Sequence, residues 1–308
     1  MKKIFAMLLM AAFFLFAGCS ESTSKHSEDG EKLTVTVTTG QIADGVKNIG
    51  GNKVKVQSLM GPGTDPHLYK ATQGDIKKLQ EADIIFYNGL HLEGKMLDIF
   101  EKMNDKIPTY AIAENIDEKD LLKNAADKKA VDPHVWFDIS LWKQALETVK
   151  DGLIKADPEN KSFYEKNADA YFKKLDELHA FAKEEMAKIP AEQRVLVTAH
   201  DAFGYFGAAY NMEVMGLQGL STDAEYGLSD VQKLVNTLVE RNIKAVFVES
   251  SISERSINAV IQGAKKKGHT VKIGGELYSD AMGEEGTDEG TYIGMYRHNI
   301  KTIVDALK

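Results

Sequence analysis

The sequence predicts an α/β fold of two similar βα lobes with parallel-type sheets, joined by one long rigid backbone helix. Short β-branched runs alternate with helical patterns from Leu33 onward, and the same alternation recurs in the second half of the chain. Between Pro158 and Pro190 the chain contains no glycine and no further proline. With 308 residues, of which 43% are hydrophobic, the chain is long enough for two ordinary domains.

Residues 33–156 are expected to form the first lobe. Its strand candidates are the runs LTVTVTT (33–39), KVKVQSLM (53–60), ADIIFYNG (82–89) and TYAIA (109–113). The spacing of apolar residues predicts a helix over 140–156 at the end of this lobe. Strands that alternate with helices favour parallel βαβ units and a sheet covered on both faces.

The segment 157–190 is predicted to be the linking helix. Asp157 and Pro158 make a suitable helix start. Apolar side chains then recur on one helical face, at Tyr164, Tyr171, Leu175, Leu178, Ala182 and Ile189. We expect this helix to be a stiff connector between the lobes.

Residues 191–308 are expected to form the second lobe. The runs RVLVTAH (194–200), AVFVES (245–250) and TVKIGG (270–275) are its strand candidates, and helices are predicted over 256–267 and 292–307. Ser229 and Gln232 are expected to form the capping box of a further helix.

The first residues have the order of a secretory signal peptide, which we place at 1–18. Lys2 and Lys3 precede an apolar run over 4–17, shorter than the roughly 20 residues of a permanent membrane helix.

Cys19 follows this run and resembles the lipidated cysteine of bacterial lipoproteins, although Phe16 stands where that pattern usually has leucine. We expect lipidation at Cys19 and a polar tether over 19–32. The alternative is an ordinary signal peptide with an incidental thiol.

Charge and cysteine content exclude several classes of protein. The chain has 38 basic and 46 acidic residues, a formal net charge of −8, so nucleic acid is not an expected partner. Cys19 is the only cysteine, which excludes an intramolecular disulfide and a metal site made of thiolates. Metal chemistry in the folded domain must therefore rest on imidazole and carboxylate groups.

Three histidines and one aspartate follow strands or precede a helix where open α/β sheets place their ligands. His67 lies in the turn-rich segment GPGTDPHLY, His134 in DPHVWFD, His200 at the end of RVLVTAH, and Asp280 in GGELYSDAMG. Three imidazoles and one carboxylate suit a first-row divalent metal, with two donors from each lobe.

Both histidines of the first lobe follow an Asp-Pro pair. Asp65 and Asp132 each stand two residues before a histidine, so each carboxylate is a candidate acceptor for the second ring N–H. His91 is the strongest competitor as a ligand, and we assign it instead a structural role with Glu93.

The segments GPGTDPHLYKATQGDIKKLQEADIIFYNGLHLEGKM, DPHVWFD, VTAHDAFGYF and GGELYSDAMG resemble those of the metal-binding lipoproteins that feed manganese and zinc ABC importers. The resemblance extends over residues 33–308. It implies a solute-binding protein with two lobes joined by a single long helix and a metal between them. The matching positions are His67, His134, His200 and Asp280.

The resemblance also implies a cargo and partners. Manganese is the expected metal because the motif wording is closer to manganese-type members and the stretch 118–129 contains no histidine. Zinc is the alternative, since several zinc or mixed members have histidine where this chain has His200. The expected partners are an ABC permease and its ATPase, for a monomer anchored by lipid to the outer face of the bacterial cytoplasmic membrane.

Two other classes of protein fit the sequence less well. A metallohydrolase needs an open metal position and a general base, and no such arrangement is recognisable, so we expect no catalytic residue and no enzyme. Ser221 and Glu249 are interpreted as hydrogen-bonding groups around the site. A surface adhesin, a description attached to relatives, is at most a secondary role because the sequence has no repeats or low-complexity stalk.

Overall fold

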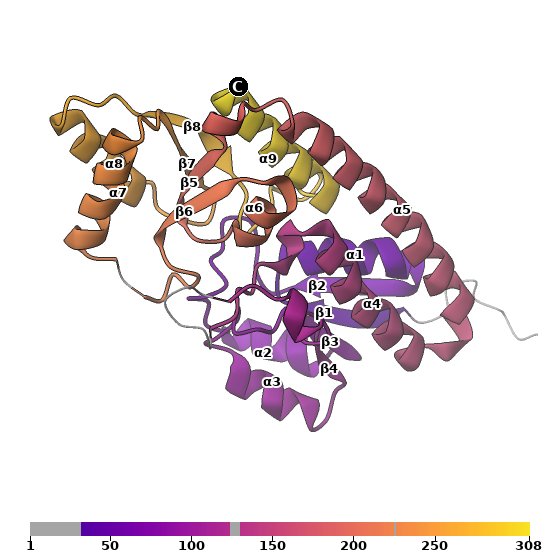
Figure 1. Cartoon of the computed structure of the whole chain (residues 1–308). Coiled ribbons are helices and arrows are strands. Elements are labelled where there is room, and N and C mark those ends of the chain that lie inside the picture. Colours follow the sequence, from indigo (N-terminus) through magenta and orange to yellow (C-terminus); the bar gives the residue numbers. More distant parts are fainter. Residues whose placement is uncertain (1–31, 124–129, 225) are drawn as a thin grey trace, which may run out of the picture. The chain divides into compact units, whose positions relative to one another are not determined.

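The computed structural model describes residues 32–123, 130–224 and 226–308 (Figure 1). The predicted signal peptide, Cys19 and nearly all of the predicted tether lie outside these residues. Within the described ranges, no helix combines the length and apolar character needed to cross a membrane.

The first lobe is built on a four-stranded parallel sheet in the order β2-β1-β3-β4. Its strands are β1 (Leu33–Val37), β2 (Val54–Ser58), β3 (Ile84–Tyr87) and β4 (Thr109–Ala111). Its helices are α1 (Gly40–Gly50), α2 (Gln73–Gln80), α3 (Leu97–Asn104) and α4 (Ile139–Ala156). In register, Val35 of β1 lies between Val56 of β2 and Ile84 of β3. The expected parallel βαβ arrangement is confirmed.

The second lobe has two parallel strand pairs, β5 with β6 and β7 with β8. Its strands are β5 (Val195–His200), β6 (Glu213–Gln218), β7 (Ala245–Glu249) and β8 (Lys272–Leu277). Its helices are α6 (Gly204–Tyr210), α7 (Leu228–Glu240), α8 (Arg255–Lys266) and α9 (Tyr292–Leu307). Because β5 packs beside β7, the order β6-β5-β7-β8 repeats the topology of the first lobe (Figure 1).

The strand β6 is absent from the sequence prediction. Gly216 interrupts its β-branched pattern, and a Cβ at this position would collide with the backbone of His200 and Asp201. The glycine therefore permits close approach of two strands at the end of β5, where His200 lies.

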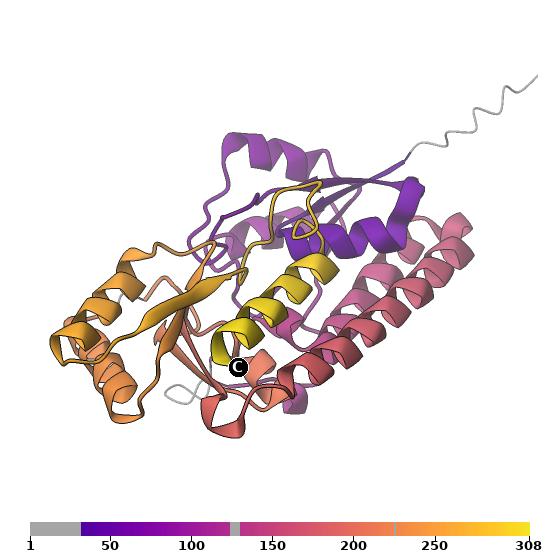
Figure 2. The ribbon, with the colours of Figure 1, turned by 90° about the horizontal axis from the view of Figure 1, so that it is seen from above.

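The helix α5 (Lys161–Met186) follows the first lobe and precedes the second in the chain. It runs alongside both lobes (Figure 2). Its 26 residues correspond to about 39 Å of helix. It starts after the short helix η4 (Pro158–Asn160), and it packs against α1 and α4 of the first lobe and α9 of the second. The hydroxyl of Tyr171 donates to the Asp44 carboxylate at 2.7 Å, which ties α5 to α1.

The expected capping box of α7 is wrong by two residues. The helix begins at Leu228 after an extended Gly227, and the carboxylate of Asp230 accepts from the Gly227 N–H at 3.0 Å. Ser229 and Gln232 both lie inside the helix. The acidic side chain at the third helical position therefore accepts the hydrogen bond of the N-cap N–H group, and no serine takes part.

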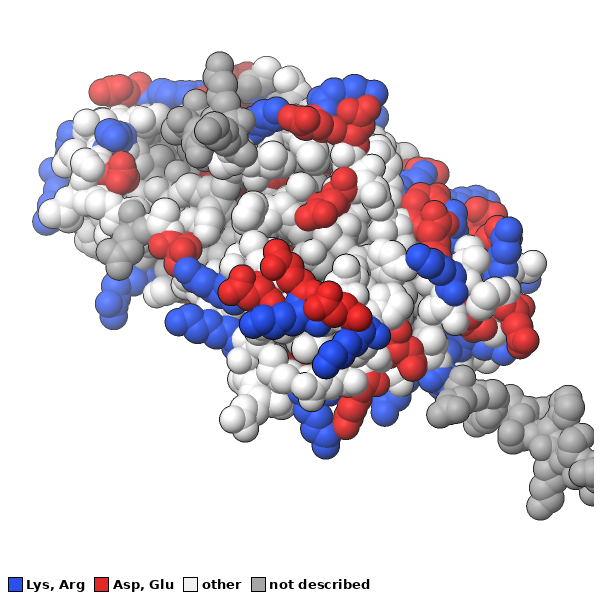
Figure 3. Space-filling model, turned by 90° about the horizontal axis from the view of Figure 1, so that it is seen from below, with Lys and Arg blue, Asp and Glu red and all other residues white. Residues whose placement is uncertain are grey.

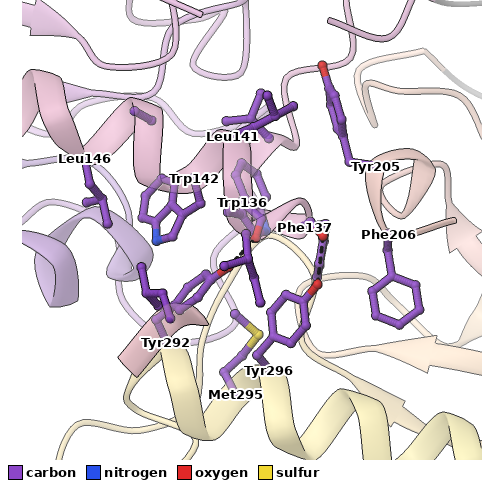
Figure 4. Close-up of a cluster of buried hydrophobic side chains, with 14 of the residues drawn as sticks. Trp136, Phe137, Leu141, Trp142, Leu146, Tyr205, Phe206, Tyr292, Met295 and Tyr296 are labelled. Atoms are coloured by element: carbon purple, nitrogen blue, oxygen red, sulfur yellow. Dashed lines mark hydrogen bonds between the residues drawn. The ribbon is translucent and has the colours of Figure 1, made fainter. Parts of the chain in front are cut away.

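One hydrophobic core is shared by the two lobes, and Figure 4 shows its centre. Here α9 reaches across to the segment η3 (Val135–Phe137) of the first lobe. The hydroxyl of Tyr292 donates to the carbonyl of Trp136 at 2.6 Å, and that of Tyr296 donates to the carbonyl of Phe137 at 2.8 Å. Buried aromatic rings with satisfied hydroxyls thus join the lobes two and three residues beyond His134.

On the face drawn in Figure 3, basic and acidic side chains lie interspersed. No broad basic field covers this face, in keeping with the net charge of −8.

Glu93 anchors the loop that supports the His134 segment. Its fully buried carboxylate accepts from Thr38 Oγ1 at 2.7 Å and from the backbone N–H groups of Asn88 and Gly89 at 2.8 and 3.2 Å. The side chain of Asn88 in turn donates to the carbonyl of Pro133 at 3.0 Å. Glu93 thus stabilises the loop on which His134 rests.

We predict that Glu93→Ala lowers the free energy of unfolding by about 3 kcal/mol, because it leaves buried donors without an acceptor. Denaturant unfolding measures this change. The control is Glu184→Ala on the exposed side of α5, for which a change within about 0.5 kcal/mol is expected. Equal stabilities for the two variants would contradict the assigned role.

Candidate metal centre

The structure brings His67, His134, His200 and Asp280 together between the two lobes. His67 lies in the loop after β2, His134 directly before η3, His200 at the last position of β5, and Asp280 in the loop after β8. One ligand atom of each lies within 4.8 Å of the others, and all four side chains are buried. Among the described residues, this is the one such group of histidine, cysteine and acidic side chains.

All three histidines turn their Nε2 atoms toward the same point. His67 Nε2 lies 3.3 Å from His134 Nε2. Asp280 Oδ1 lies 3.3 Å from His134 Nε2, while Oδ2 lies 3.3 Å from His200 Nε2 and 3.7 Å from His67 Nε2. Both carboxylate oxygens therefore face the ring nitrogens.

These separations fit a metal ion. Donors placed about 2.1 Å from a tetrahedral centre are separated by about 3.4 Å. Neither oxygen of Asp280 has an aligned hydrogen-bond donor among the described residues, although the side chain is buried. Buried polar groups are normally paired, so converging groups without such pairing are typical of a metal site.

Carboxylates orient two of the three imidazoles. His134 Nδ1 lies 2.7 Å from Asp132 Oδ1, and His200 Nδ1 lies 2.6 Å from Glu249 Oε2. Glu249 also accepts from the backbone N–H of His200 at 2.8 Å. Carboxylates at Nδ1 leave Nε2 directed toward the metal and strengthen it as a ligand. The expected roles of Asp132 and Glu249 agree with these contacts.

The expectation that Asp65 also accepts from its histidine ring is wrong. Its Oδ1 accepts from the backbone N–H of His67 at 2.9 Å, and its Oδ2 accepts from Thr222 Oγ1 of the other lobe at 2.6 Å. The Nδ1 atom of His67 has no hydrogen-bond partner among the described residues. The Asp65 carboxylate, which the Asp-Pro-His spacing predicts to contact the His67 ring, is thus hydrogen-bonded to Thr222 of the other lobe.

The electrostatic surroundings of the three rings differ accordingly. Burial lowers the pKa of His67 to about 3. Burial also acts to lower the pKa of His134, but Asp132 and Asp280 outweigh it and raise that pKa to about 9. For His200, Glu249 and Asp280 outweigh burial and hold the pKa well above its usual value. His134 and His200 thus favour protons in the metal-free site.

His91 does not join the cluster. Its side chain is exposed, and its backbone adopts a left-handed φ of 65°. Glu93 supports the loop through the contacts described above, with Thr38, Asn88 and Gly89 as its donors. Ser221 lies on the exposed side of the site, where its hydroxyl accepts from the backbone N–H of Asp223 at 3.2 Å.

A cavity of about 640 Å³ lies beside the cluster, with His67 in its wall. His91, Glu114 and Leu220 also line it. A larger cavity of about 980 Å³ lies along β8 and α9 and contains none of the four clustered residues. The cavity beside His67 therefore borders the candidate site.

Two α/β lobes with a buried His3Asp group between them define the class as a two-lobed protein with a candidate metal centre. Residues 35–306 match the family described as "Zinc-uptake complex component A periplasmic" (ZnuA). The chain belongs to this family of metal ABC transporter substrate-binding proteins.

Several relatives resemble the chain along most of its length. The manganese-binding lipoprotein MntA of Bacillus subtilis is 56% identical over 305 residues, 99% of each chain. The zinc-binding protein TroA of Treponema pallidum is 48% identical over 279 residues, 91% of this chain and 90% of that protein.

Solved structures confirm the fold. The periplasmic zinc-binding protein TroA from Treponema pallidum superposes with a TM-score of 0.87 at 47% identity, covering 90% of this chain and 99% of that one. A manganese-bound periplasmic metal-binding protein from Candidatus Liberibacter asiaticus has a TM-score of 0.78 at 26% identity, covering 90% and 100%.

We predict that Asp132→Asn and Glu249→Gln each weaken metal binding about 10- to 100-fold, because each removes the carboxylate that orients a ring. Titration calorimetry with Mn²⁺ measures the loss. Asp65→Asn is the matched control, since its carboxylate contacts no ring, and it should cause a much smaller loss. Losses of equal size in all three variants would contradict the assigned contacts.

We also predict that binding at pH 7 releases about one to two protons per metal ion, because His134 and His200 must lose protons to coordinate. Metal and protons compete, so affinity should fall as the pH is lowered. Calorimetry in buffers with different ionisation enthalpies measures the released protons, and the same heat in every buffer would contradict this prediction.

Proposed function

We propose that this protein is the extracytoplasmic solute-binding component of an ABC importer for manganese. In this proposal, His67, His134, His200 and Asp280 bind the ion reversibly as transported cargo, and the protein delivers it to a membrane permease and its ATPase. The buried cluster of three imidazoles and one carboxylate between the lobes carries the proposal. It offers the ion a site that no single lobe contains.

Two observations favour manganese as the cargo. Both oxygens of Asp280 face the ring nitrogens, so a bidentate carboxylate would supply a five-donor site, and carboxylate oxygens and more than four donors suit Mn²⁺. In addition, the relative at 56% identity is named as manganese-binding. Neither observation depends on the other.

Zinc is the second candidate. A relative at 48% identity is named as zinc-binding, and zinc binds a given nitrogen and oxygen site more tightly than manganese does. Selection of manganese would therefore rest on the geometry of the site or on metal supply.

Entry of the ion is assigned to the side of the site lined by His67. On this side the lobes are joined by the Asp65–Thr222 hydrogen bond and by an exposed ion pair of Lys95 with Asp223 at 2.7 Å. An exposed pair of this kind contributes about 1 kcal/mol or less. Separation at this rim costs less than separation of the buried aromatic contacts near α9, so ions enter and leave on the rim side.

The membrane attachment is part of the same proposal. Residues 1–18 would be removed as a signal peptide, and Cys19 would carry lipid at the head of the tether 19–32. Relatives named as lipoproteins support this arrangement. The protein would then work as a monomer on the outer face of the cytoplasmic membrane. Because its family is a transport family, we propose no enzymatic activity, and we propose that any adhesive role is secondary to transport.

The test is a metal titration of the wild type and of two ligand variants. His67→Ala and Asp280→Ala should lose at least about tenfold in Mn²⁺ affinity, since each removes a direct ligand. His91→Ala is the control, because this histidine is exposed and lies outside the cluster. One ion bound per wild-type chain, with binding unchanged in the control, is the expected result.

Competition between Mn²⁺ and Zn²⁺, together with metal analysis of protein purified from its native host, decides the cargo. Zinc in the native protein would replace manganese in the proposal. Failure of the wild type to bind either ion, or full binding by both ligand variants, would overturn it.

A further inference from the structure

Among the described residues, the side chains of Asp280 and His67 have no hydrogen-bond partner outside the cluster, and Asp280 is the only carboxylate of the four. Among the described residues, neither of its oxygens has an aligned hydrogen-bond donor, and its near neighbours are the rings of His67, His134 and His200. By contrast, Asp132 accepts from the ring of His134, and a carboxylate oxygen of Glu249 lies 2.6 Å from Nδ1 of His200. The position of the Asp280 carboxylate therefore depends on how its backbone is held.

The second lobe holds the start of this loop. The buried side chain of Asn299, on α9, accepts from the Tyr278 N–H at 2.9 Å and donates to the Tyr278 carbonyl at 2.7 Å. This pair of bonds fixes the peptide groups on either side of Tyr278, two residues before Asp280.

The first lobe holds the next peptide. Trp136 Nε1 donates to the carbonyl of Ser279 at 3.1 Å, and Gln41 Nε2 donates to the same oxygen at 3.3 Å. Both donor side chains are buried. This carbonyl belongs to the peptide group that joins Ser279 to Asp280. Two hydrogen bonds from the opposite lobe therefore fix the orientation of the Asp280 backbone.

Trp136 also contacts another member of the cluster. Its ring meets that of His134 edge to face, with centroids 5.2 Å apart, and its own carbonyl accepts from Tyr292 on α9 (Figure 4). Trp136 thus lies where the two lobes and two of the proposed ligands meet.

We propose that Trp136 and Gln41 are positioning residues that hold Asp280 in the metal site from across the lobe interface. Loss of either bond lets the Asp280 peptide shift, so its carboxylate holds the ion less firmly and the ion leaves faster. This inference rests on the proposed function and goes beyond it, because neither residue is one of the proposed metal ligands. In this inference, two residues of the first lobe position Asp280, a proposed metal ligand of the second lobe.

The experiment measures how fast Mn²⁺ leaves the full-length protein into excess chelator. Trp136→Phe keeps an aromatic ring but removes the donor, and Gln41→Leu removes the second donor at similar volume. Trp142→Phe is the matched control. Trp142 is equally buried in the same hydrophobic core (Figure 4), and its Nε1 has no hydrogen-bond partner among the described residues. We expect about tenfold faster dissociation for Trp136→Phe, a smaller acceleration for Gln41→Leu, and no change for Trp142→Phe.

A second readout separates positioning from loss of stability. With Co²⁺ as the bound ion, a carboxylate that coordinates through one oxygen in place of two lowers the coordination number, which strengthens the visible absorption band. This band should strengthen in Trp136→Phe and in Gln41→Leu and stay unchanged in Trp142→Phe. Loss of core packing alone would affect the two tryptophan variants alike.

Equal dissociation rates and equal Co²⁺ spectra for Trp136→Phe and Trp142→Phe would overturn the inference. If Trp136→Phe does not fold, Gln41→Leu decides, and wild-type behaviour of that variant overturns the inference. In both cases a wild type that still binds metal leaves the proposed function standing. A wild type that binds no metal refutes the proposed function itself.

Discussion

The structure depends on one constraint: four buried polar side chains from two lobes meet at one point. His67 and His134 belong to the first lobe, and His200 and Asp280 to the second, so a small shift of one lobe changes every distance between the two pairs. The shared apolar core, the tyrosine hydroxyls of α9 and the helix α5 hold the lobes together. Precise placement of the cluster is thus a property of the interface between the lobes rather than of either lobe alone.

The support around the cluster is uneven. His134 and His200 each have a carboxylate at Nδ1, whereas His67 has none among the described residues and lies in the wall of a cavity. The well-supported ligands are fully enclosed, and the less supported one lies on the side from which an ion can arrive. This uneven support is consistent with the reversible capture that we propose.

The cluster itself was predictable because each member follows a local signal. His200 ends a clear strand, and the Asp-Pro-His spacing places a carboxylate two residues from His134, close enough to reach its ring. The same spacing misleads at His67, because Thr222, 157 residues away, occupies an oxygen of Asp65. The strand β6 was missed for a related reason. Gly216 is required by the close approach of the β5 backbone, which the sequence of β6 itself does not reveal. Gln41, Trp136 and Asn299 carry no motif that would connect them with Asp280.

The sequence by itself determined the α/β class, the parallel strands, the long central helix and the four residues of the cluster. These follow from hydrophobic period, turn residues and strand ends, which act over a few neighbouring positions. Only the tertiary structure decided that Asp65 contacts Thr222 in place of its histidine ring, and which residues of the first lobe hold the Ser279 carbonyl. Those contacts join residues up to 238 positions apart, and a hydrogen bond over such a separation depends on how the lobes pack rather than on any local pattern.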